Sequence, residues 1–350
     1  NEPVGDGVSR VLPIDTTRIK RIAVIGKLAA KPNIGDKGSS KPRPPYVITP
    51  LEGLRAAVPQ ACEVMYNNGR VIKKAADIAR KADIAVIIVG YTYRDEGEYM
   101  LTRGGDREIL TLKPPDERLI LQTVAANPNT LVVLMGGSAI ITEAWREKVP
   151  ALLMAWYPGM EGGNALADIL LGKVNPCGKL PCVFPRSENQ LPFFDKRAKS
   201  IEYGYFHGYR FIDKQGQTPA FPFGFGLSYT TFTYKNLQID RDEISPDEVL
   251  KVSVDVANTG GVAGEEVVQL YVGYEGSRVE RPVKELKGFS KIGLAPGQTK
   301  RVDFLLAAKQ LAYYDEQQGK WIVEPLTYSV YVGPSSRTED LLGIKFLIRA

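Results

Sequence analysis

The first half of the chain alternates short apolar runs with segments of helical periodicity. The apolar runs predict strands at 22–26, 62–66, 83–90, 130–135 and 151–157. The segments between them predict helices at 50–58, 73–81, 116–126 and 161–171, the first with Thr49 as its N-cap. The run at 83–90 is almost wholly apolar, which is typical of a strand covered on both faces. This alternation predicts a mostly parallel sheet between helices, with a ligand site beyond the carboxyl ends of its strands.

The hydrophobic pattern changes near residue 215. After a segment rich in glycine, proline and aromatic residues, apolar and polar positions alternate with a period of two at 250–256, 268–272, 302–306 and 328–332. Turn residues such as those at 258–261 and 296–297 separate these runs. This part predicts an antiparallel sandwich of about seven strands. The expected organisation is an α/β domain at 20–215, a linker at 216–232 and a β-sandwich domain at 233–350.

Composition excludes several classes of protein. The 350 residues are 44% hydrophobic, which leaves room for about two domains. The formal charge of +5 comes with no basic stripe or tail, so no nucleic-acid partner is expected. No apolar run approaches the roughly 18 residues of a membrane span, so no membrane partner is expected. The single histidine, His207, excludes most histidine-built metal sites, and neither a metal nor a cofactor is expected.

The cysteine and glycine motifs argue against several further functions. The three cysteines match no zinc or disulfide framework. Cys177 and Cys182 lie close enough to pair, although free, partly buried thiols are favoured. The segment 172–179 resembles a phosphate-binding loop, but its glycines are one residue too far apart and Leu180 replaces Ser or Thr. The segment 136–140 lacks the closing glycine of a nucleophile elbow. Nucleotide-binding and serine-hydrolase functions are therefore disfavoured.

A long polar stretch, 91–113, follows the apolar strand at 83–90. It places three carboxylates, Asp95, Glu96 and Glu98, within four positions. Like charges raise one another's pKa, which helps to keep one group protonated near neutral pH as a general acid. On composition alone, a solvated acidic loop is the favoured alternative.

Several further motifs lie before, within and after this loop, and their order along the chain is informative. They are IAVIG at 22–26, GDKGSS at 35–40, GDR at 105–107, WYPGMEGGNA at 156–165, NPCGKLP at 175–181, GYRF at 208–211, PFGFGLSY at 222–229 and RPVKELKGF at 281–289. Over nearly all of its length the chain resembles the C-terminal half of glycoside hydrolase family 3, the family of β-glucosidases and related exo-acting enzymes. The resemblance implies an α/β sandwich domain followed by a fibronectin type III-like domain.

The resemblance also implies a general acid/base on the acidic loop, where the family carries Glu-Gly shortly before Asp-Arg. Counting without gaps from Val89-Gly90 assigns this role to Glu98, and matching on Glu-Gly assigns it to Glu96, the second choice. The sequence departs from the family pattern because Tyr99 follows Glu98 where glycine is common. Extra residues also separate Glu98 from Asp106-Arg107.

Two other segments are candidates for shaping the site. The loop at 35–40 is expected on the same sheet edge as the acidic loop, which makes Asp36, Gly38 and Ser39, together with Tyr99, candidate substrate-binding residues. A tight turn that needs glycine is the alternative for this loop. Trp156 and Tyr157 end a predicted strand and are candidates for stacking on sugar, although core packing is favoured.

The family's nucleophile is an Asp on a separate (β/α)8-type barrel, which also supplies a Lys-His pair that holds the sugar. No barrel-length segment precedes residue 20, and His207 does not stand in a Lys-His pair. Residues 1–19 are therefore expected to be a linker from a barrel outside this chain. The resemblance implies a part of a retaining β-glycosidase that hydrolyses terminal non-reducing β-D-glucosyl residues. It implies a β-linked glucoside or oligosaccharide as substrate, a barrel domain or chain as partner, and no activity without it.

Two further hypotheses stay open. The first is a non-catalytic carbohydrate-binding or scaffold fragment, which the expected lack of a nucleophile favours. The second and weaker one is a nucleotide-binding doubly wound protein. Homo-oligomer formation, the choice of glycone and linkage, and the compartment (secreted, periplasmic or cytoplasmic) are not decided by the sequence.

Overall fold

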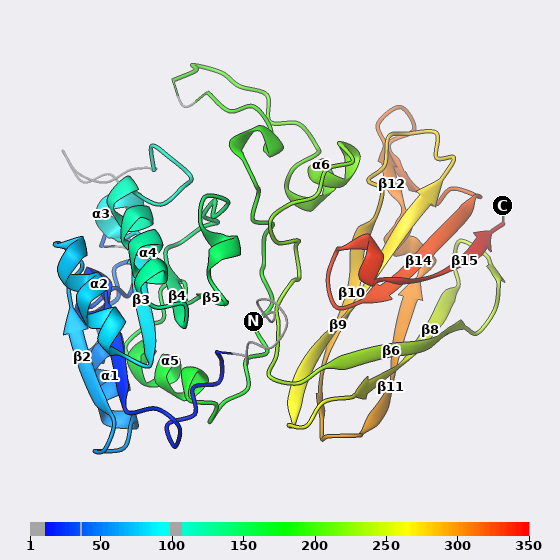
Figure 1. The fold of residues 1–350 in the computed structure, drawn as a ribbon. Helices are drawn as coiled ribbons and strands as arrows, with labels where there is room; N and C mark the ends of the chain where they lie inside the picture. The colour runs from blue at the N-terminus through cyan, green and yellow to red at the C-terminus, as the bar shows by residue number, and fades with distance from the viewer. Residues whose placement is uncertain (1–10, 36, 99–106, 196, 350) are drawn as a thin grey trace. The chain divides into compact units, whose positions relative to one another are not determined.

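The computed structural model describes residues 11–35, 37–98, 107–195 and 197–349 (Figure 1). The chain divides into two compact units, Asn1–Val174 and Asn175–Ala350, and each unit is considered by itself. The domain limits at 20–215, 216–232 and 233–350 remain predictions from the sequence.

The first unit contains a five-stranded, wholly parallel sheet in the order β2-β1-β3-β4-β5. Its strands are β1 (Arg21–Ile25), β2 (Glu63–Asn67), β3 (Ile84–Gly90), β4 (Thr130–Met135) and β5 (Ala151–Met154). Every residue of β3 and β4 is buried, as the apolar runs predict. The parallel α/β fold is thus confirmed. The predicted strand at 151–157 is three residues too long, because β5 ends at Met154. Two residues later, Trp156 takes a left-handed backbone conformation with φ of 52°, which does not continue a strand.

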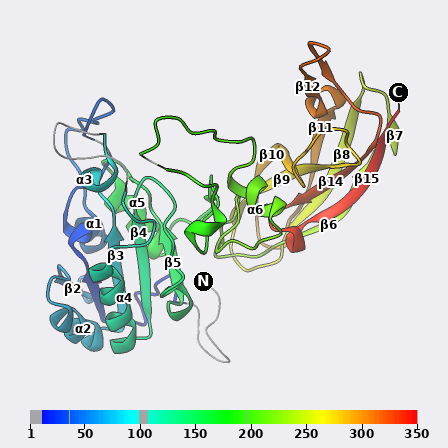
Figure 2. The ribbon, with the colours of Figure 1, turned by 90° about the horizontal axis from the view of Figure 1, so that it is seen from above.

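Helices cover both faces of this sheet (Figures 1 and 2). α1 (Pro50–Ala57) packs beside α5 (Gly162–Leu170), and α2 (Ile72–Lys81) packs beside α4 (Pro114–Ala126). The predicted N-cap Thr49 is confirmed, because its side chain and that of Glu52 form a capping box. On the face of α2 and α4, the core contains Ala75, Ala79, Leu119, Ile120, Ala85, Ile87 and Val89.

Two glycines bring α1 and α5 into backbone contact. A Cβ atom on Gly53 would lie 2.1 Å from the carbonyl oxygen of Gly163, and one on Gly163 would lie 2.1 Å from the carbonyl oxygen of Thr49. Neither distance is compatible with a side chain. The two helices therefore approach as closely as their backbones permit, which only glycine allows.

The strand order reverses direction between β1 and β3, so the loops after these two strands flank a topological switch point. The long polar loop leaves the sheet at Gly90, whose φ is +135° and whose Cβ atom would lie 1.9 Å from the carbonyl oxygen of Met135. Only glycine fits there. The acidic loop therefore begins at the carboxyl end of β3, beside the switch point, which is where ligands bind in such folds.

The second unit is a β-sandwich of a five-stranded sheet, β10-β9-β14-β15-β7, and a three-stranded sheet, β11-β8-β6, with a separate β12-β13 hairpin. Its elements are α6 (Gly208–Lys214), β6 (Phe232–Ile239), β7 (Glu243–Ile244), β8 (Val249–Asn258), β9 (Gly264–Glu275), β10 (Glu285–Leu294), β11 (Thr299–Ala307), β12 (Tyr313–Asp315), β13 (Lys320–Ile322), β14 (Thr327–Gly333) and β15 (Leu342–Ile348). The predicted sandwich is confirmed. The three strands beyond the predicted seven correspond to β7, β12 and β13, which have only two or three residues and are too short to show a period of two.

The central strand β9 is buried on both faces. The period-two pattern places Val268, Leu270 and Val272 in the sandwich core, where they lie, and directs Gln269 and Tyr271 to the opposite face. That opposite face is covered, and these two residues are 3% and 0% exposed. The Tyr271 hydroxyl donates to Gln269 Oε1 at 2.6 Å, and Gln269 Nε2 donates to backbone carbonyl oxygens at 2.6 and 3.1 Å. The polar groups that the pattern assigns to an outer face are therefore satisfied internally.

The cysteines are free thiols, as favoured from the sequence. Among the residues that the structure describes, no helix has the length and apolarity needed to cross a membrane.

The helix contact at Gly53 predicts the effect of a small substitution. Gly53→Ala should gain about 1 kcal/mol of helix propensity, yet we expect a net loss of about 1–3 kcal/mol in the free energy of unfolding because the added methyl group overpacks the α1–α5 contact. Chemical denaturation followed by circular dichroism measures this. Gly178→Ala is the control, since its Cβ atom meets nothing within 4 Å. Equal or greater stability of Gly53→Ala would contradict the backbone contact.

Candidate functional site

The base of the acidic loop is closed around Tyr91, which is 2% exposed. Its N–H donates to the carbonyl oxygen of Met135 at 2.8 Å, and its own carbonyl oxygen accepts from Asn33 Nδ2 at 2.9 Å. Its hydroxyl donates to the carbonyl oxygen of Thr111, and the guanidinium of Arg107 lies 4.6 Å from its ring centroid. The outgoing and returning ends of the loop are thus held together by one aromatic residue.

A single helical turn, α3 (Tyr93–Glu96), follows, and Asp95 has a structural role in it. The N–H and hydroxyl of Thr92 both donate to Asp95 Oδ2 at 3.0 Å, which completes a capping box, and Lys113 pairs with the other carboxylate oxygen. Burial acts to raise the pKa of Asp95, but the hydrogen bonds from Lys113 and Thr92 outweigh burial and hold the pKa below its ordinary value. Asp95 is therefore ionised at neutral pH, and both of its carboxylate oxygens have partners within the protein.

Glu96 joins three loops through its carboxylate. Its Oε1 accepts from the Tyr157 hydroxyl at 2.6 Å and from the N–H of Gly137, and its Oε2 lies 3.3 Å from Arg107 Nε. The side chains of Glu96 and Arg107 are only 10% and 5% exposed. The pKa of Tyr157 lies above its ordinary value, mainly because the phenol is buried and also because it donates to Glu96. The phenol therefore keeps its proton and remains a donor. All three neighbours of Glu96 donate, and its carboxylate acts as a nearly buried acceptor.

Arg107 extends this network to the loop after β4. Its Nη2 donates to the carbonyl oxygen of Ala139 at 2.7 Å and to the hydroxyl of Ser138. Sequence reasoning includes Arg107 only as part of a family motif, and it assigns no role to Gly137 or to the Tyr157 hydroxyl. The available signal was that these residues follow predicted strands, whose carboxyl ends meet at one sheet edge.

Glu98 differs from both of the preceding carboxylates because it is exposed. Its Oε2 accepts from the N–H of Ser39 at 2.6 Å, and its Oε1 accepts from the Ser39 hydroxyl at 2.5 Å. Nearby, Lys37 Nζ lies 4.1 Å from the ring centroid of Tyr93. The expectation that the 35–40 loop shares an edge with the acidic loop is confirmed, and the structure brings Ser39 and Glu98 together.

The other predicted site residues have different outcomes. Gly38 precedes Ser39 in a turn in which its carbonyl oxygen accepts from the N–H of Lys41 at 3.2 Å. Asp36 and Tyr99 lie outside the described residues. Tyr157 is half-buried and its hydroxyl donates to Glu96. Sugar stacking and core packing stay predictions for Trp156 and Tyr157. Among the described residues, no cluster of three His, Cys, Asp or Glu side chains could hold a metal ion.

Comparison with known proteins defines the class to which this fold and site belong. Residues 7–229 match the glycosyl hydrolase family 3 C-terminal domain, and residues 266–336 match the fibronectin type III-like domain. The chain therefore belongs to glycosyl hydrolase family 3 and corresponds to its C-terminal region.

Individual relatives agree with this assignment. A β-xylosidase from Formosa agariphila is 37% identical, with 97% of this chain and 48% of the relative covered. Thermostable β-glucosidase B from Acetivibrio thermocellus is 38% identical, with 90% and 43% covered.

Solved structures also superpose over nearly the whole chain. The crystal structure of a β-D-glucoside glucohydrolase from Trichoderma reesei has a TM-score of 0.89 at 29% identity and covers 97% of this chain and 53% of its own. A family 3 β-glucosidase from Bifidobacterium adolescentis has a TM-score of 0.86 at 32% identity, with 97% and 50% covered. The chain thus spans about half the length of the curated relatives and solved structures that it matches.

The contrast between Glu96 and Glu98 predicts different effects on stability. Glu96→Gln should lower the free energy of unfolding by about 3–5 kcal/mol, because the nearly buried guanidinium of Arg107 loses its counter-charge. The exposed Glu98→Gln substitution, which serves as the matched control, should change it by about 0.5 kcal/mol or less. Denaturant titration compares the two variants. Equal stability of both would contradict the structural role of Glu96.

The lowered pKa of Asp95 predicts a pH-dependent contribution to stability. Because the folded-state pKa lies below the ordinary value of 3.8, the stabilisation is fully present above that value and is lost as pH falls through the folded-state pKa. Asp95→Asn should cost about 1–2 kcal/mol near neutral pH, and the gap to wild type should narrow below about pH 4. Unfolding titrations at a series of pH values measure this gap. A gap that stays constant down to about pH 3 would contradict the assignment.

Proposed function

We propose that this chain supplies the general acid/base part of a retaining β-glycosidase, with Glu98 as the acid/base. The observation that carries the proposal is the exposure of Glu98 at the topological switch point, beside the donors of Ser39. The two neighbouring carboxylates already have structural partners, because Asp95 caps α3 and Glu96 bonds three donors. Of the three clustered carboxylates Asp95, Glu96 and Glu98, Glu98 is therefore the one best placed to meet a substrate.

The proposed reaction has two steps. First, protonated Glu98 gives its proton to the glycosidic oxygen as the bond to the anomeric carbon breaks, while an Asp of a (β/α)8-type barrel attacks that carbon. Second, Glu98 removes a proton from water, the water oxygen bonds to the anomeric carbon, and the Asp carboxylate leaves. The N–H and hydroxyl of Ser39 hold the Glu98 carboxylate in place between the two steps. The barrel lies outside these 350 residues in this proposal, and the chain is inactive without it.

The proposed substrate is a β-linked glucoside or oligosaccharide, cleaved at its terminal non-reducing β-D-glucosyl residue. The β-glucosidase names of several relatives and solved structures support this choice. Gly38, next to Ser39, is proposed to lie near the bound sugar, and so are Asp36 and Tyr99, which lie outside the described residues.

The test is Glu98→Gln in the assembled enzyme, with this chain and a barrel both present. Turnover of substrates with poor leaving groups should fall by about 10²–10⁴-fold, because the proton donor is lost. Activated aryl glucosides need less protonation and should lose much less, and added azide should partly restore their turnover. Glu63→Gln is the matched control, since Glu63 is an exposed carboxylate at the amino end of β2.

Two results would overturn the proposal. If Glu96→Gln shows the leaving-group dependence and azide rescue while Glu98→Gln behaves as wild type, the acid/base is Glu96. If the chain binds sugar but a barrel-bearing chain never confers activity on it, the chain is a non-catalytic carbohydrate-binding fragment.

A further inference from the structure

The second unit carries an exposed tryptophan on the short β12-β13 hairpin. Trp321 is 70% exposed, although tryptophan is usually well buried. Tyr314, directly opposite on the other strand and 50% exposed, packs edge-on against it, with 5.5 Å between ring centroids and 66° between ring planes. The cross-strand pair fixes the orientation of the indole while leaving most of it open to solvent.

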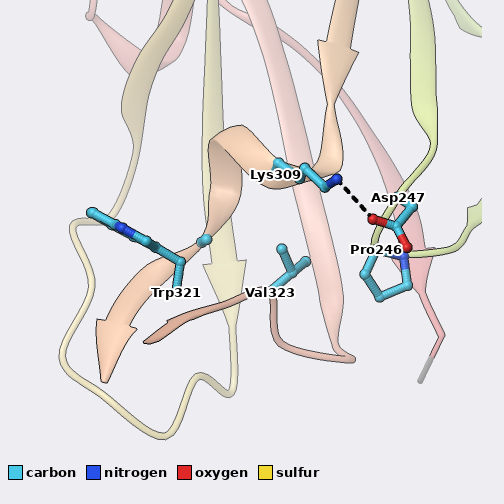
Figure 3. Close-up of a pocket in the computed structure, with 6 residues that line it drawn as sticks. Pro246, Asp247, Lys309, Trp321 and Val323 are labelled. Atoms are coloured by element: carbon cyan, nitrogen blue, oxygen red, sulfur yellow. Dashed lines mark ion pairs between the residues drawn. The ribbon is translucent and has the colours of Figure 1, made fainter. Parts of the chain in front are cut away.

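Trp321 forms one side of a hollow of about 600 Å³, which is within the usual range for small-ligand sites. Figure 3 shows the indole on one side and the side chains of Lys309 and Asp247 on the other, with Val323 and Pro246 nearby. The lining residues come from three parts of the unit: the turn after β7, the short helix at 308–311 with Ala312 just after it, and strand β13 with Val323 just after it. The hollow is therefore a feature of the folded sandwich.

The polar groups of the hollow form an ion pair that remains available to a ligand. Lys309 Nζ lies 3.0 Å from Asp247 Oδ1, and the two side chains are 74% and 82% exposed. Such a pair contributes little to stability. It presents ammonium donors next to carboxylate acceptors and has no net charge, which suits a neutral ligand whose groups both donate and accept hydrogen bonds.

We propose that this hollow binds a neutral oligosaccharide. A pyranose ring presents a face of C–H bonds, which suits the negative face of the indole of Trp321, and a rim of hydroxyl groups, which suits Asp247 and Lys309. A phosphate or uronate would place a negative charge beside Asp247 without a surplus cation among the lining residues. The site would let the protein hold a glycan through its β-sandwich, which goes beyond the hydrolysis proposed for the acidic loop and does not depend on Glu98.

The experiment titrates the full chain with cellohexaose and xylohexaose at up to millimolar concentrations. Binding is followed by calorimetry and by protection of tryptophan fluorescence from acrylamide quenching. Trp321→Ala should weaken binding at least about tenfold, as expected when a central aromatic contact is removed. Trp321→Phe should retain part of the affinity because it keeps an aromatic face. Thermal unfolding of each variant confirms that the sandwich is folded.

Two controls separate this site from other surfaces of the chain. Phe289→Ala removes an aromatic residue of similar exposure, 69%, from β10 outside the hollow and should leave binding unchanged. Glu63→Gln removes an exposed carboxylate outside the hollow and should also leave binding unchanged. The measurement is of binding and not of hydrolysis, so failure of the catalytic proposal does not affect this one. The proposal is overturned if neither saccharide binds, or if folded Trp321→Ala binds as wild type. It is also overturned if only a barrel-bearing chain, and no saccharide, protects Trp321 from quenching.

Discussion

The ion pair between Glu96 and Arg107 is the contact on which the geometry of the candidate site depends. It joins the outgoing and returning ends of the acidic loop, and Gly137 and Tyr157 connect the same carboxylate to the loops after β4 and β5. A nearly buried pair is costly unless other polar groups replace the solvation that both charges have lost. Gly137 and Tyr157 do this for Glu96, and Ser138 and Ala139 do it for Arg107 Nη2, whereas Arg107 Nη1 has no hydrogen-bond partner in the part of the chain that the structure describes. The three loops must therefore be in place together, and Glu98 lies only two residues from this junction.

Local patterns were enough to predict most of the framework. Continuous apolar runs identified β3 and β4, and a threonine before a proline identified the N-terminus of α1, because these signals depend on neighbouring residues alone. The partners of Glu96 could not be found in this way. They lie 11, 41 and 61 positions away, and only the strand order brings them to one edge. The local sequence shows that three carboxylates lie close together. It does not show that Asp95 and Glu96 have structural partners while Glu98 is exposed.

The β-sandwich shows the same limit at Gln269 and Tyr271. Alternation along β9 indicates which residues share a face, but not whether that face meets water. In the structure Tyr209 of α6 lies edge-on to Tyr271, with 6.1 Å between ring centroids, and the inner polar groups are paired. At the hairpin the opposite holds, because Trp321 stays exposed although its size would favour burial. Coverage of a face is thus a tertiary property that strand periodicity leaves open.

The contact between Ser39 and Glu98 has two halves of different chemical origin. One donor is the serine hydroxyl, and the other is the backbone N–H, which every residue except proline possesses. Sequence drift at position 39 can therefore remove the first bond while the second persists, and only proline removes both. A protein that holds an acidic residue partly through its main chain tolerates variation in the neighbouring loop, since a single missense change there seldom releases the carboxylate completely.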